Sequence, residues 1–107
     1  MEGQVVAEVS IVPVGTGSAG LSHYVAACLE ILEVRKDISY QLTPMGTVIE
    51  GTLDKILEVT RAMHEVPFHK GAVRVVTTLR IDDRRDKTSA MAAKVQSVLK
   101  LRPSVKT

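Results

Sequence analysis

The stretch VVAEVSIVP, residues 5–13, shows the clearest periodicity in the sequence. Every second residue is apolar, so two sets alternate along it: Val5, Ala7, Val9 and Ile11 against Val6, Glu8, Ser10 and Val12. A period of two predicts a β-strand with one buried face. Pro13 lacks the N–H that a sheet ladder needs, so we expect the strand to end there.

The spacing changes after a loop of small residues at 15–18, and the new spacing is helical. It predicts a helix from near Ser18 or Ser22 to about Lys36, with this inner stripe: Leu21, Val25, Cys28, Leu29 and Leu32. Two short strands follow, at 39–43 and 47–51. Between them stands Thr43-Pro44-Met45-Gly46, which fits a type I turn because Pro occupies its second position and Gly its fourth.

A second helix should follow this hairpin, with an inner stripe of Leu53, Ile56, Leu57, Thr60 and Met63. We expect it to stop by Val66, because Pro67 disfavours helical geometry in the residue before it. Residues 73–81 alternate again and predict a fourth strand. A last helix should begin near Thr88, with one apolar face formed by Met91, Val95, Val98 and Leu99.

The predicted order is strand, helix, strand, strand, helix, strand, helix. Two interleaved right-handed strand–helix–strand units satisfy this order economically. We therefore predict an α+β fold, a ferredoxin-like βαββαβ sandwich whose four-stranded antiparallel sheet carries helices on one face, with an added C-terminal helix. Residues 1–107 should form a single ligand-binding domain.

Composition limits the classes of function. With 107 residues, 45% of them hydrophobic, the chain can bury a core without staples. Its one cysteine, Cys28, allows no internal disulfide, and no stretch approaches the ~20 apolar residues of a membrane helix. The start also lacks the pattern of a signal peptide. We expect a soluble cytoplasmic protein that does not bind membranes.

The charge is uneven along the chain. Residues 1–70 hold five Lys/Arg and nine Asp/Glu, whereas residues 71–107 hold nine and three. A basic C-terminal helix with a solvated face explains this pattern. A nucleic-acid surface is the alternative, but single-strand binding normally needs stacking aromatics, and the chain has only Tyr24, Tyr40 and Phe68.

The predicted topology brings the loop after Val12, the hairpin turn and the segment 68–71 to one end of the sheet. Small and hydroxylated residues gather there: Thr16, Gly17, Ser18, Ser22, Thr43, Gly46 and Thr47. Such residues allow close approach and both donate and accept hydrogen bonds. The alternative is that they are ordinary turn and cap residues.

Glu50 is unusual because it stands inside a short strand. Strand parity places Ile49 toward the helices and Glu50 on the open face, together with Glu8, Ser10, Arg74 and Arg80. A ligand contact and a structural ion pair both explain it. The same face carries Val6, Val12, Val48 and Val76, and a half-apolar open sheet predicts self-association to a dimer or tetramer.

No catalytic residues and no metal ligands are predicted. His64 and His69 are five residues apart, which is not the helical spacing of a zinc pair, and His23 starts a helix. Cys28 lies in an apolar stripe, where a Cys–His pair is implausible. The run 82–87 mixes both charges and is typical of a salt-bridged loop rather than a metal site.

Four stretches together resemble the YkoF-like family of small thiamine-binding proteins: AEVSIVPVGT (7–16), LSHYVAA (21–27), YQLTPMGTVIEG (40–51) and VVTTLRIDDRR (75–85). The resemblance covers nearly the whole chain. It implies a ferredoxin-like fold, dimers or tetramers, and binding of thiamine or its hydroxymethylpyrimidine moiety without chemistry and without a further cofactor.

Within this resemblance, the turn residues, Glu50 and the residues after the first strand match the family pattern, and Tyr40, Tyr24 and Phe68 are the candidates to stack on a pyrimidine. Our candidate ligand-binding set is Ser10, Thr16, Ser22, Tyr40, Thr43, Met45, Gly46, Thr47 and Glu50. The sequence leaves three functions open: a thiamine- or pyrimidine-binding protein for sensing, buffering or delivery, a regulatory module for another metabolite, and a nucleic-acid-binding domain of similar topology.

Overall fold

The computed structural model describes residues 3–17, 20–86, 91–102 and 104. The described elements follow the predicted order: β1 (Val5–Pro13), α1 (Ser22–Glu33), β2 (Ser39–Thr43), β3 (Gly46–Gly51), α2 (Leu53–His69), β4 (Val75–Asp82) and α3 (Met91–Leu101). The predicted hairpin is therefore confirmed as β2 and β3.

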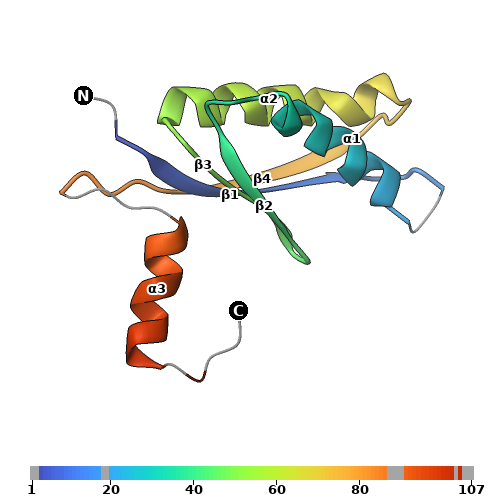
Figure 1. Cartoon of the computed structure of the whole chain (residues 1–107). Coiled ribbons are helices and arrows are strands. Elements are labelled where there is room, and N and C mark those ends of the chain that lie inside the picture. The colour runs from blue at the N-terminus through green and yellow to red at the C-terminus, as the bar shows by residue number, and fades with distance from the viewer. Residues whose placement is uncertain (1–2, 18–19, 87–90, 103, 105–107) are drawn as a thin grey trace.

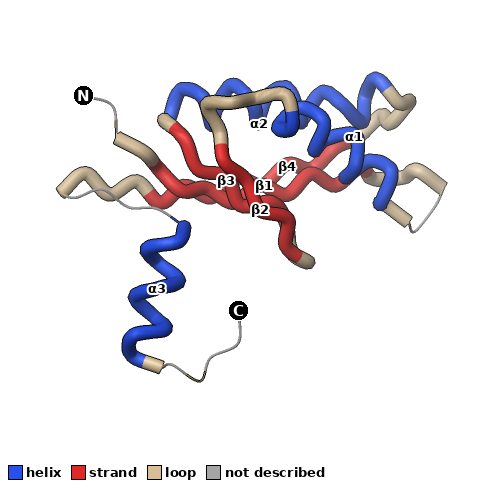
Figure 2. Tube along the Cα trace, viewed as in Figure 1, coloured by secondary structure: helices blue, strands red, loops and turns tan. Residues whose placement is uncertain are grey.

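The four strands form one antiparallel sheet in the order β2-β3-β1-β4. Figure 2 shows the strands as a single layer, and in Figure 1 both α1 and α2 cover the same face of it. α3 lies on the other side (Figure 1). This arrangement confirms the predicted ferredoxin-like α+β sandwich with an added helix.

The core lies between the sheet and the two covering helices. Val5, Ala7 and Val9 of β1 are each at most 2% exposed, as the alternation in that strand predicts. α2 packs against β1, β3 and β4, whereas α1 packs chiefly against α2. The rest of the buried cluster comes from the helices, β3 and the loop before β2: Cys28, Leu32, Ile38, Ile49, Ile56, Val59 and Met63.

The expected end of the second helix at Val66 is wrong, because α2 continues through Pro67 to His69. Proline has no N–H, so the carbonyl of Met63, four residues earlier, loses its helical donor. The Sγ of Cys28 donates to that carbonyl at 3.5 Å instead. Pro67 is also fully buried, and this packing offsets part of the cost of a proline in the last turn.

Other boundaries differ by a few residues. α1 ends at Glu33, short of the predicted Lys36. β4 begins at Val75, and Val73 is 87% exposed. The predicted start of the last helix at Thr88 falls outside the described residues.

None of the α3 side chains that the structure describes, those of residues 95–101, is buried. Val95, Val98 and Leu101 are exposed and Leu99 is half-buried. Among the described residues, α3 makes no extensive contact with the sheet or with the other two helices. In the described part of the chain, α3 therefore has exposed apolar side chains, and so does the sheet face opposite α1 and α2.

Candidate ligand-binding pocket

The edge of the sheet is stepped, because β1 is longer than its neighbour β3. The register pairs Val9 of β1 with Thr47 of β3, and that is the last pair between these strands. β1 continues to Pro13 with only β4 beside it. α1 begins above this end of the sheet and the β2–β3 turn lies beside it, so a hollow forms between them.

This hollow is a pocket of about 790 Å³, within the range of small-molecule sites in proteins. The second half of β1 and the first two turns of α1 form two of its sides, and the ends of β2 and β3 with the turn between them form a third. α2 contributes a single residue. The lining residues are Val9, Ser10, Ile11, Val12, Leu21, Ser22, Val25, Ala26, Cys28, Leu29, Leu42, Thr43, Pro44, Met45, Gly46, Thr47 and Met63.

Four hydroxyl groups provide the side-chain polarity of the pocket. Thr43 uses its own to fix the turn: its Oγ1 donates to the carbonyl of Gly46 at 2.8 Å and accepts from the N–H of Met45 at 3.3 Å. Within the described part of the chain, the hydroxyls of Ser10, Ser22 and Thr47 form no hydrogen bond. These three groups are available to a bound molecule.

The turn itself must pass very close to β1. A Cβ added at Gly46 would lie 2.9 Å from the carbonyl oxygen of Val9, a contact that side chains do not tolerate. Glycine at this position therefore lets the hairpin close one side of the pocket. Met45, at the tip, is 82% exposed and can adapt to an occupant because its side chain is flexible.

The floor of the pocket is apolar and contains the only cysteine. Cys28 and Met63 are nearly fully buried. Burial raises the pKa of the Cys28 thiol, and the thiol is engaged with the Met63 carbonyl. A protonated, engaged thiol is a poor nucleophile, so this residue contributes shape rather than reactivity.

Six of the predicted site residues line the pocket together: Ser10, Ser22, Thr43, Met45, Gly46 and Thr47. Three do not. Thr16 lies in the loop after β1, and Tyr40, on edge strand β2, pairs with Ile49. Glu50 pairs with Val6 on the open face, so it does not line the pocket with the other six residues.

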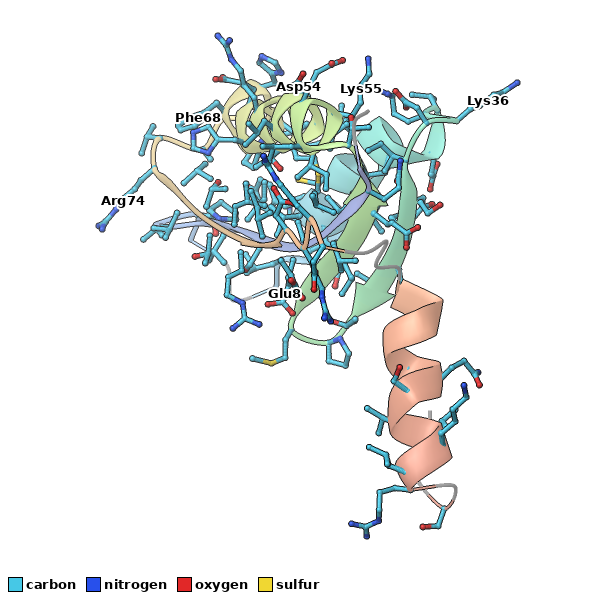
Figure 3. The ribbon with its side chains drawn as sticks, turned by 90° about the vertical axis from the view of Figure 1, so that its left-hand side faces the viewer. Glu8, Lys36, Asp54, Lys55, Phe68 and Arg74 are labelled. Carbon is cyan, nitrogen blue, oxygen red and sulfur yellow. The ribbon has the colours of Figure 1, made fainter. Side chains whose placement is uncertain are left out.

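The open face holds the polar residues that strand parity predicted. Glu8 and Arg80 are directly opposite one another and form an ion pair at 3.5 Å. Figure 3 shows Glu8 on the side of the sheet away from Asp54 and Lys55 of α2. Arg74 precedes β4 rather than lying within it, and its carbonyl accepts from the N–H of Val14.

The sequence pattern places several pocket residues in the core instead of the site. Leu21, Val25, Cys28 and Leu29 follow one helical stripe, and Met63 belongs to the inner stripe of the second predicted helix. An apolar stripe normally packs on a sheet, so nothing in its spacing indicates that half of it borders a hollow. The signal that could have shown this is the different length of β1 and β3.

His64 connects two elements of the fold. His64 Nδ1 lies 2.6 Å from Thr77 Oγ1, which joins α2 to β4, and its ring stands edge-on to Phe68. Among the described residues, no group of three or more His, Cys, Asp or Glu side chains could hold a metal ion. No helix in the described ranges is long and apolar enough to cross a membrane.

The sequence is similar to those of several proteins. "UPF0045 protein YqgV" of Bacillus subtilis is 49% identical over 98 residues, covering 89% of this chain and 94% of the relative. A UPF0045 protein of Methanothermobacter thermautotrophicus is 43% identical over 95 residues, covering 88% and 95%.

Solved structures share the fold. A hypothetical protein of Methanocaldococcus jannaschii superposes with a TM-score of 0.80 at 39% identity, covering 89% of this chain and 95% of that one. A putative thiamine biosynthesis/salvage protein of Thermotoga maritima gives a TM-score of 0.73 at 20% identity, covering 89% and 98%, which shows the shared fold alone. A family model described as "Thiamine-binding protein" matches residues 7–99. The chain belongs to this family of thiamine-binding proteins.

Proposed function

We propose that the protein binds thiamine or its hydroxymethylpyrimidine moiety without chemical change, in the pocket between β1, α1 and the β2–β3 turn. The observation that carries this proposal is the pocket itself: a hollow of about 790 Å³ with apolar walls and three unengaged hydroxyl groups. Membership of the family supports the choice of ligand. Sensing, buffering and delivery are all served by such reversible binding.

The charge of the pocket decides which end of thiamine enters. None of the described lining residues is Asp, Glu, Lys, Arg or His. An unpaired cation is costly to bury, so the positively charged thiazolium ring should stay at the mouth. The neutral aminopyrimidine ring fits the interior, where aliphatic side chains contact its faces and hydroxyls bond to its nitrogens.

We also propose that the pocket binds its ligand without catalysing a reaction. The one thiol in the pocket is buried with a raised pKa, and the hydroxyls of Ser10, Ser22 and Thr47 have no histidine or carboxylate among the lining residues to activate them. The free cysteine also suits a reducing compartment, in keeping with our prediction of a cytoplasmic protein.

Titration calorimetry tests the proposal. Wild-type protein is titrated with thiamine, thiamine phosphates, hydroxymethylpyrimidine, the hydroxyethylthiazole moiety and a short RNA. We expect heat from the first three and none from the thiazole or RNA. An Asp83→Asn variant in the loop after β4 serves as the control and should bind as wild type does. Absence of heat with every pyrimidine-containing ligand would remove the proposed function.

We also propose that the protein self-associates through the open sheet face. Val12 and Val76 are directly opposite each other and are 38% and 45% exposed. Val6 and Val48 are on the same face, partly buried. A mixed apolar and charged surface of this kind favours burial against a second copy, in a dimer or tetramer.

A further inference from the structure

The step between β1 and β3 leaves part of the β1 backbone without a neighbouring strand. Pairing with β3 ends at Val9, whereas pairing with β4 continues to Pro13. The edge of β1 opposite β4 is therefore free from residue 10 onward. The peptide groups that point toward this free edge need another partner or water.

Strand geometry identifies the residue whose N–H and C=O groups point toward the free edge. The N–H of Val14 donates to the carbonyl of Arg74 at 2.9 Å, so Val14 faces the β4 side. In an antiparallel ladder, successive residues point their N–H and C=O groups to opposite sides. Val12 therefore faces β4, and Ile11 and Pro13 face the free edge. The carbonyl of Val9 lies against Gly46 of β3, which agrees with this alternation.

Ile11 thus has both its N–H and its C=O directed to the free edge. No hydrogen bond within the described ranges uses either group on that side. Pro13, the next residue with the same direction, has no N–H to offer. Ile11 holds the last donor on this edge.

The pocket surrounds this edge. Its lining includes Val9 and Ile11, whose side chains face the helices, and also Ser10 and Val12, whose side chains face the open side. A hollow that touches both faces of one strand must extend around the edge of that strand. The free N–H and C=O of Ile11 consequently lie in the wall of the pocket.

A peptide strand is an unsuitable partner for this edge. Strand addition depends on a row of main-chain hydrogen bonds, and here Pro13 removes the next donor while β3 occupies the preceding positions. A compact molecule with one donor beside one acceptor matches the single free pair. In an aminopyrimidine, an amino group adjoins a ring nitrogen and supplies this combination.

We propose that the backbone N–H and C=O of Ile11 recognise the pyrimidine ring, the N–H donating to a ring nitrogen and the C=O accepting from the amino group. This inference rests on the proposed function and identifies the contact that selects an aminopyrimidine. The side-chain hydroxyls of the pocket then form further hydrogen bonds beside these two main-chain contacts.

Amide resonances of isotopically labelled protein test the contact. On titration with hydroxymethylpyrimidine, the Ile11 amide proton should shift downfield and gain protection from solvent exchange. The amide of Val12, already bonded to β4, serves as the internal control and should change little. Binding that leaves the Ile11 amide unchanged would overturn the inference while preserving the proposed function, whereas no binding would overturn both.

Two variants provide a second, independent readout. Ile11→Pro removes an N–H that takes no part in the ladder with β4, so the fold should survive, as it does with Pro13. Its affinity for hydroxymethylpyrimidine should fall at least about tenfold, because a ring nitrogen is left unpaired. Ile11→Val keeps the N–H and changes only the side chain, so its loss of affinity should be much smaller than that of Ile11→Pro. Equal losses in both variants, with circular dichroism showing intact folds, would attribute the effect to the side chain and contradict the inference.

Discussion

Thr47 and Glu50 separate two interpretations of the site, because they belong to the same strand but face opposite sides of the sheet. Thr47 is 5% exposed and lines the pocket, whereas Glu50 pairs with Val6 on the open face. Both are ligand contacts in the set predicted from the sequence. Of the two, only Thr47 lines the pocket.

We expect Thr47→Val to weaken hydroxymethylpyrimidine binding by about twofold to tenfold, because one neutral hydrogen bond contributes roughly 0.5–1.5 kcal/mol. Glu50→Gln should leave the affinity unchanged. Calorimetry on both variants checks this. A tenfold to hundredfold loss in Glu50→Gln, the size expected for a charged hydrogen bond, would instead place the ligand on the open face.

For individual residues, the sequence predicted where hydroxyl groups gather, but it did not predict the shape of the end of the sheet. Thr43, Gly46 and Thr47 were found because the turn chemistry of Pro44 and Gly46 fixes a hairpin. The role of Ile11 was not found, because its side chain shows only a buried strand position. A free backbone edge depends on the register between two strands, which no single residue type signals.

Among the elements, α2 shows how tertiary contacts override a local rule. Pro67 predicted an earlier end, yet α2 continues to His69. Cys28 supplies a donor to the Met63 carbonyl, which the proline leaves without its helical partner. The two residues are 35 positions apart. Sequence patterns reveal the proline but not the distant thiol that compensates for it.

Cys28→Ala should therefore destabilise the protein by about 1–3 kcal/mol, the usual cost of leaving a buried acceptor unpaired. Cys28→Ser retains a donor at the same position and should lose less. Urea denaturation of both variants measures the difference. If serine and alanine cost the same, the thiol–carbonyl contact contributes nothing and only side-chain volume matters.

The connection from α1 to β2 is fixed to α2 by an exposed charge cluster. Arg35 bonds Asp37 at 3.0 Å and Glu58 at 2.9 Å, and Lys55 lies 3.7 Å from both carboxylates. Hydrogen bonding from Arg35 lowers the pKa of Asp37 from 3.8 to about 2. The group therefore stabilises the fold above about pH 4 and loses this contribution as the pH falls toward 2.

We expect Asp37→Asn to reduce the acid sensitivity of the protein. Wild-type stability should drop between about pH 5 and about pH 2.5, and the variant should show a smaller drop. The effect is modest because the Asp37 side chain is 42% exposed. Urea denaturation at the two pH values measures it, and equal drops in both proteins would show that Asp37 titrates normally.

For the whole molecule, the order of strands and helices predicted the topology, because two interleaved right-handed strand–helix–strand units satisfy that order most economically. The sheet order β2-β3-β1-β4 follows from it. The placement of α3 does not, because its apolar residues Val95 and Val98 predict a buried face, whereas both are exposed in the part of the chain that the structure describes.

The exposed valines of the open face lead to a test of self-association. A double change of Val12 and Val76 to Lys places two like charges opposite each other and should reduce a dimer or tetramer to smaller species. Light scattering at micromolar concentration measures the mass. A monomeric wild-type protein would contradict the proposed interface.

The most direct measurement of the central claim is a crystal structure of the protein with hydroxymethylpyrimidine. We expect one ring between β1, α1 and the β2–β3 turn, with its amino group and a ring nitrogen at the Ile11 backbone and Thr47 within hydrogen-bonding distance. A ring bound on the open face beside Glu50, with the pocket filled only by water, would contradict it.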